Sequence, residues 1–278
     1  MAIATTATRR THADPGPAFS VRRLAALAPS KFLVLMRDPL ALFSSLLMPP
    51  ALAALVLAQA GEEHRDTLAA IVVPTLVATS LLMGVYVVLT TWCVEWRESG
   101  VLKRMLTGRT TRAELLTSMS VPSVVTLVGQ VVLSFVVLQV FDVRLDLTNP
   151  VLAAVGVLGG LALCVLLGAA TSGVTKTASG SQITTLPIAL AGLFLSGTMG
   201  HVPEVFAPVA PFTPLYPVVE LVRIGLSGLT ADSLANDGAV LTFAESWGAA
   251  GRSVAVLAAW ILVAALASRW LMRWLPRR

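Results

Sequence analysis

Apolar residues form long uninterrupted runs in this chain, and the polar residues between them fall in short clusters. A bilayer core about 30 Å thick requires roughly 20 mostly apolar residues in a helix that rises about 1.5 Å per residue. Six runs approach or exceed that length, and the fifth is the shortest. They cover residues 40–60, 68–93, 119–141, 151–172, 183–199 and 254–274. Because backbone polar groups in lipid must be satisfied within the segment, such long runs predict helices rather than barrel strands.

Composition supports the same class. Of the 278 residues, 56% are hydrophobic and 13% are charged. A water-soluble fold with this composition would expose too much apolar side chain. We therefore predict an all-α membrane protein with six transmembrane helices.

The positions of Lys and Arg orient these helices, because cytoplasmic loops carry the excess of basic residues. When the ends and the loops are assigned alternately to two sides, all but four of the 20 basic residues fall on one side. The exceptions are Arg65, Arg144, Arg223 and Arg252. Both termini are therefore predicted in the cytoplasm, in a protein of the cytoplasmic membrane. This topology accounts for the net charge of +5, and without a basic and aromatic patch we expect no nucleic-acid partner.

The first residues differ from the rest. Residues 1–19 are rich in Thr, Ala and Pro, which predicts a disordered cytoplasmic tail rather than a signal peptide. From Ser20, apolar positions recur at helical spacing against basic ones, which predicts an amphipathic helix in the membrane interface. An inward extension of the first spanning helix is the alternative. Within that span, Pro49 and Pro50 predict a kink.

Two features inside the runs predict contacts between helices. Pro122 and Gln130 interrupt the third run, and an amide in lipid is costly unless it faces another helix or a substrate path. Gly156 and Gly160 in the fourth run have the spacing of small residues that lets two helices approach closely.

About fifty residues separate the fifth and sixth runs, which is long for a simple loop. The pair Thr213 and Pro214 predicts a helix start, and the apolar residues that follow end at Gly228. A second apolar piece covers 205–209. We predict two short extracellular helices that dip into or lie on the outer leaflet and form a lid.

The sequence contains no internal source of energy for transport. No predicted span has a buried acid, Lys or His of the kind that relays ions, and the chain has no phosphate-binding loop. It also has no metal-spaced His or Cys cluster and no nucleophile paired with a base. We therefore expect no catalytic residues, no bound metal and no cofactor in this chain, and an energy source in another protein.

The densest cluster of charge is 95–112, between the second and third runs and on the predicted cytoplasmic side. It reads Glu-Trp-Arg-Glu-Ser-Gly-Val-Leu-Lys-Arg over 95–104. Three other features accompany this stretch: the amphipathic start that leads into Arg-Asp-Pro at 37–39, Phe-Leu-Ser-Gly at 194–197 and the Pro-rich segment 211–223. Together, the four features resemble those of the membrane-spanning subunits of type 2 ABC exporters. The resemblance covers nearly the whole chain, with 20–278 as the transmembrane domain. The drug- and antibiotic-export branch is the most similar.

The resemblance implies a half-transporter, in which this permease pairs with a second copy of itself or with a homologue. Two separate ABC ATPase subunits would bind ATP and Mg²⁺ on the cytoplasmic side. The stretch between the second and third spans would be a coupling helix seated on the ATPase. Its expected contact residues are Glu95, Arg97, Glu98, Gly100, Val101, Leu102, Lys103 and Arg104. A solvated charged loop that only fixes topology is the alternative.

The expected function is ATP-driven efflux of an amphipathic or hydrophobic compound, such as a drug, an antibiotic or a lipid-like molecule. The path would be lined by the first, second and fifth helices. Candidate path residues, each of which could instead be a packing residue, are Tyr86, Gln130, Phe194, Ser196 and Met199. Export of a lipid-linked glycan stays open, although the aromatic content of 6% argues mildly against a polysaccharide conduit. A non-transporting anchor or sensor that recruits a cytoplasmic partner is the other alternative.

Overall fold

The computed structural model describes residues 46–59, 65–100, 112–143, 147–198, 202, 205–236 and 239–271, and every regular element among them is a helix. The α-helices are α3 (Met48–Gln59), α4 (Arg65–Thr79), α5 (Val88–Glu98), α7 (Arg112–Val140), α8 (Pro150–Val174), α9 (Ser181–Leu195), α10 (Tyr216–Ser227), α11 (Ala231–Ala235) and α12 (Phe243–Leu271). The π-helical segment η3 (Ser80–Val87) joins α4 to α5, and the 3-10 turn η4 (Ala210–Phe212) precedes α10. The all-helical prediction is confirmed for these residues.

Four of the described helices are long and apolar enough to cross a membrane. They are Leu68–Glu98, Leu116–Val140, Pro150–Val174 and Phe243–Leu271, and they contain most of the second, third, fourth and sixth predicted runs. The helix α9 has 15 residues, fewer than the roughly 20 that a crossing requires. Of the first run, only 46–59 is described, and a π-helical turn at Leu46 and Leu47 precedes α3. The count of six spans therefore stays a prediction, and the tail and amphipathic helix lie outside the described residues.

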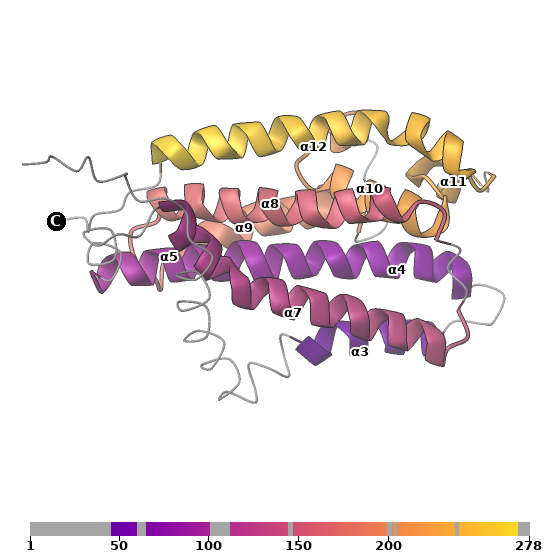
Figure 1. Ribbon diagram of the computed structural model, residues 1–278, viewed down its shortest axis with the longest axis horizontal. Helices are drawn as coiled ribbons and strands as arrows, with labels where there is room; N and C mark the ends of the chain where they lie inside the picture. Colours follow the sequence, from indigo (N-terminus) through magenta and orange to yellow (C-terminus); the bar gives the residue numbers. More distant parts are fainter. Residues whose placement is uncertain are drawn as a thin grey trace, which may run out of the picture.

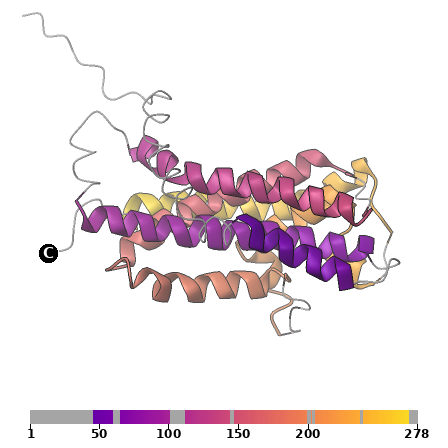
Figure 2. The ribbon, with the colours of Figure 1, turned by 90° about the horizontal axis from the view of Figure 1, so that it is seen from below.

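The long helices run side by side, with α8 between α12 and the continuous helix formed by α4, η3 and α5 (Figure 1). The short helix α10 packs against α8, α12 and α4. On the other side, α3 and α7 contact each other and α4. The helix α9 packs on η3 and α5 and stands at the edge of the bundle (Figure 2). The helix Leu68–Glu98 therefore touches most of the other helices.

Glycines allow α10 to approach α8 closely. A Cβ atom at Gly225 would lie 2.5 Å from the backbone nitrogen of Ala153. A Cβ at Gly156 would lie 3.1 Å from the Cβ of Leu221, and one at Gly160 would lie 2.8 Å from Val218 Cγ1. The prediction that Gly156 and Gly160 mark a close helix contact is confirmed, and the sequence did not identify Gly225 as the third glycine of that contact.

The segment before the last helix differs from the predicted one. The helix α10 begins at Tyr216 and not after Thr213, with Pro217 in its first turn, and it ends as predicted at Gly228, whose φ is 67°. Residues 205–209 form turns rather than a helix, because Pro208 and Pro211 have no amide hydrogen to donate. With Val218, Leu221 and Ile224 fully buried, α10 lies inside the bundle.

The last helix begins at Phe243, well before the predicted Val254. Thr242 and Glu245 cap its first turn: the Thr242 amide and hydroxyl donate to Glu245 Oε2 at 2.9 and 2.8 Å. The outer segment is correspondingly shorter than expected.

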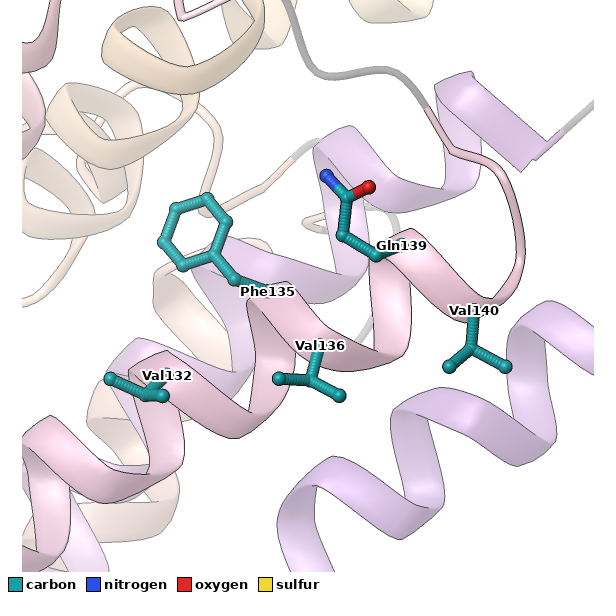
Figure 3. Close-up of a pocket in the computed structure, with 5 residues that line it drawn as sticks. All are labelled: Val132, Phe135, Val136, Gln139 and Val140. Carbon is teal, nitrogen blue, oxygen red and sulfur yellow. The ribbon is translucent and has the colours of Figure 1, made fainter.

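The outer face of α7 is apolar. Val132, Phe135, Val136 and Val140 are exposed and, with Gln139, line a shallow cavity of about 480 Å³ (Figure 3). An exposed row of this kind suits contact with lipid chains. The helix continues through Pro122, as the predicted span 119–141 requires. Gln130 is buried, as expected of an amide that faces another helix.

We predict that Gly225→Ala destabilises the protein by about 2 kcal/mol, because the new methyl group would overlap the α8 backbone. Thermal unfolding in detergent measures the change. Gly251→Ala in α12 is the matched control, because nothing lies within 4 Å of its Cβ position. Equal unfolding temperatures for the two variants would contradict the close contact.

Candidate functional site

The charged stretch begins at the end of α5. This helix continues beyond the predicted end of the second span and stops at Glu98, with Ser99 as its C-cap. The Ser99 amide donates to Glu95 O at 2.9 Å and the Gly100 amide donates to Arg97 O at 3.2 Å. Gly100 has φ 71°, a conformation that glycine adopts without strain. The chain therefore turns sharply at Gly100, directly after the end of α5.

Arg97 holds the ends of two helices together. Its guanidinium is buried and donates to Ser172 O at 2.7 Å, to Thr175 O at 2.6 Å and, more weakly, to Lys176 O at 3.4 Å. The first two carbonyls lie at the C-terminal end of α8, where the last turn lacks intrahelical donors. Arg97 therefore fixes α5 to α8 and points into the protein.

Other side chains at this end face outward. Glu95 and Glu98 are exposed, and Glu98 Oε2 accepts the Ala178 amide at 3.3 Å. Glu114, in the first turn of α7, is fully buried, but it precedes the membrane-spanning part of that helix, which begins at Leu116. The remaining predicted coupling residues, Val101, Leu102, Lys103 and Arg104, lie outside the described residues.

A larger cavity lies at the opposite end of the bundle from α5, beside α10 and α11 (Figure 1). Its volume is about 650 Å³, within the range of small-molecule sites. Most of its lining is apolar. The polar and charged residues of its wall are Ser196, Tyr216, Arg223, Asp232 and Arg252.

A buried ion pair on α10 reaches this cavity through Arg223. Arg223 Nη1 donates to Glu220 Oε2 at 2.7 Å, and Glu220 Oε1 accepts the Ala231 amide at 3.0 Å. Burial raises the pKa of the Glu220 carboxyl, while Arg223 and the Ala231 amide act in the opposite direction. Burial also raises the pKa of Tyr216 to about 12. This pair was not predicted from the sequence, although an acid and an arginine three positions apart in an apolar helix are a usable signal.

Residues 47–270 match the family model described as ABC-2 family transporter protein. The chain belongs to the ABC-2 transporter family. No curated protein and no solved structure matches it. Membership makes the chain the membrane-spanning permease component of an ABC transporter, a component that associates with ABC ATPase subunits and is generally not itself catalytic. The part of the permease that the structure describes has no group of three or more His, Cys, Asp or Glu placed to hold a metal ion.

The candidate path residues of the permease occupy different surroundings. Tyr86 is fully buried, with its hydroxyl 3.3 Å from Thr171 Oγ1. Ser196 is buried at the end of α9 and lines the large cavity. Phe194 is exposed and stacks edge to face on Phe206, with ring centroids 6.4 Å apart. Of the candidates, only Ser196 is brought to the large cavity, while Met199 lies outside the described residues.

We predict that Arg97→Lys lowers the free energy of unfolding by about 2 kcal/mol, because a lysine ammonium cannot replace the fork that binds Ser172 and Thr175 together. Denaturant unfolding in detergent measures it. Lys176→Gln, an exposed change at the same end, should leave stability unchanged. A fully stable Arg97→Lys variant would show that these bonds do not hold the two helices.

Proposed function

We propose that this permease is the membrane subunit of an ATP-driven exporter in the cytoplasmic membrane, with both termini in the cytoplasm. Two ABC ATPase subunits and a second membrane subunit, a copy or a homologue, complete the transporter. It moves an amphipathic or hydrophobic compound, such as a drug, an antibiotic or a lipid-like molecule, out of the cell.

One observation carries this proposal: a single continuous helix joins the charged end of the bundle to the large cavity. The helix runs from Leu68 to Glu98. Ile71, near its start, lines the cavity, while Glu98, in the predicted coupling stretch, ends it. At 1.5 Å per residue, the two positions are roughly 40 Å apart along the axis. A displacement of the coupling stretch would therefore act directly on the helix that forms part of the cavity wall.

The positions of the charges support the division of roles. Arg97 is engaged by carbonyls of α8 and the turn after it, so the ATPase contact falls to the exposed acids and to the stretch that follows Gly100. In the proposed cycle, ATP binding draws the ATPase subunits together and shifts the coupling stretch of each permease. The bundles then rock and open a path between the paired membrane subunits.

The form of the cavity supports an amphipathic substrate. Apolar residues such as Ile71, Phe212 and Leu234 share its wall with a few charged groups. By the distribution of basic residues, this end faces outward.

We predict that Arg104→Glu and Glu98→Arg each weaken binding of the partner ATPase by about tenfold, because each reverses a charge at the proposed contact. Co-purification and equilibrium binding measure the affinity. Arg269→Glu, an exposed arginine on α12, is the matched control. If both variants bound the ATPase and supported transport like the unaltered protein, the coupling assignment would be lost.

We also expect an amphipathic drug to stimulate ATP hydrolysis by the reconstituted complex and to accumulate in inverted vesicles. A lipid-linked glycan serves as the competing substrate in the same assay. Stimulation by the glycan alone would assign the transporter to the glycan class, and an inert complex would favour an anchor or sensor.

A further inference from the structure

Arg223 is a buried cation whose hydrogen bonds are incomplete. The residue is 5% exposed, and its Nη1 is paired with Glu220. Its Nε is buried without a hydrogen-bond partner, the one such side-chain atom in the part of the chain that the structure describes. An unpaired buried donor costs free energy, and an arginine cannot remove that cost by losing its proton. The Arg223 guanidinium, which lines the cavity, therefore favours a ligand that supplies an acceptor.

The groups around Arg223 leave room for an anion. Arg252 approaches the same cavity from α12 and adds a second positive charge. The Glu220 carboxylate is occupied on both oxygens, by Arg223 and by the Ala231 amide. Asp232 also lines the cavity, but it is exposed. Solvent therefore screens the repulsion between Asp232 and an anion more than it screens the attraction between the buried Arg223 and that anion. Tyr216 contributes a hydroxyl from the first turn of α10.

The rest of the cavity wall is mostly apolar and suits a ligand with an apolar body. Ile71, Ala210, Phe212 and Leu234 line the cavity, which is large enough for a small amphipathic molecule. An inorganic anion alone would leave this surface uncovered.

We propose that the cavity beside α10 binds the anionic group of an amphipathic molecule, with the Arg223 guanidinium as a hydrogen-bond donor, Arg252 as a second cation and the apolar wall against the ligand's tail. The recognised chemistry is a phosphate or carboxylate oxygen attached to an alkyl or similarly apolar body. Only the interpretation of the cavity as an outward-facing substrate or lipid site of the exporter rests on the proposed function. Its existence can be tested without the ATPase.

The experiment is equilibrium binding of radiolabelled dodecyl phosphate to the full chain in maltoside micelles, which contain no phosphate. Arg223→Lys keeps a positive charge beside Glu220 but removes the guanidinium donors, and Arg252→Gln removes an exposed charge. Each should weaken binding about tenfold, the effect of losing one charge-assisted hydrogen bond or ionic contact. Arg269→Gln on the same helix as Arg252 should bind like the unaltered protein.

Competition identifies the source of the anion. Unlabelled dodecyl phosphate should displace the probe at far lower concentrations than inorganic phosphate or dodecanol. Equal competition by inorganic phosphate would overturn the amphipathic ligand, and equal competition by dodecanol would overturn the anion contact. Unchanged binding in both Arg223→Lys and Arg252→Gln would overturn the site even if ATPase association held. Loss of the coupling contact with intact probe binding would instead reject only the exporter mechanism.

Discussion

The close contact between α10 and α8 is the constraint on which the rest of this bundle depends. A helix of 12 residues cannot cross a bilayer, so its backbone ends must find partners inside the protein. Gly225 brings α10 against α8 closely enough for its carbonyl to accept the Asn149 amide at 3.0 Å. Asn149 also caps α8 through Leu152 and donates to Ser246 Oγ of α12 at 2.9 Å. One asparagine and one glycine thus join three helices, and this junction sets the place of the cavity wall.

Two buried arginines at opposite ends show how the same side chain serves different purposes. Arg97 is surrounded by carbonyl oxygens of α8 and the turn after it, which use its planar fork to fix two helix ends. Arg223 has an acid on one side and a donor with no partner on the other. A structural arginine is expected to be satisfied within the fold. The incomplete one is therefore the better candidate for ligand binding.

The four long spans were predictable because length and hydropathy alone determine them, and the Gly156 and Gly160 spacing indicated a close contact. The start of α12 was not predictable, because Gly248, Gly251 and Arg252 lower the hydropathy of its first part. Its first turn is instead held by the cap that Thr242 and Glu245 form. Similarly, the sequence of a charged stretch does not show which of its side chains is buried. Arg97 is buried because the carbonyl groups at the end of α8 lie beside it. The cavity depends on the folding of α10 back into the bundle, a tertiary arrangement that no local pattern encodes.

The helix from Leu68 to Glu98 is not uniform, and this bears on how it could transmit movement. Its α5 part is attached to α8 by Arg97 and by Thr90, whose hydroxyl donates to Tyr86 O at 2.7 Å and lies 3.4 Å from Gly168 O. Its α4 part packs on α10 and reaches the cavity. Between them η3 has the wider turns of a π-helix, whose hydrogen-bond pattern departs from that of both neighbours. Force applied beside Glu98 would move α5 and the end of α8 as one unit. Because η3 departs from α-helical hydrogen bonding, it is the part of this helix where the direction of α5 can differ from that of α4.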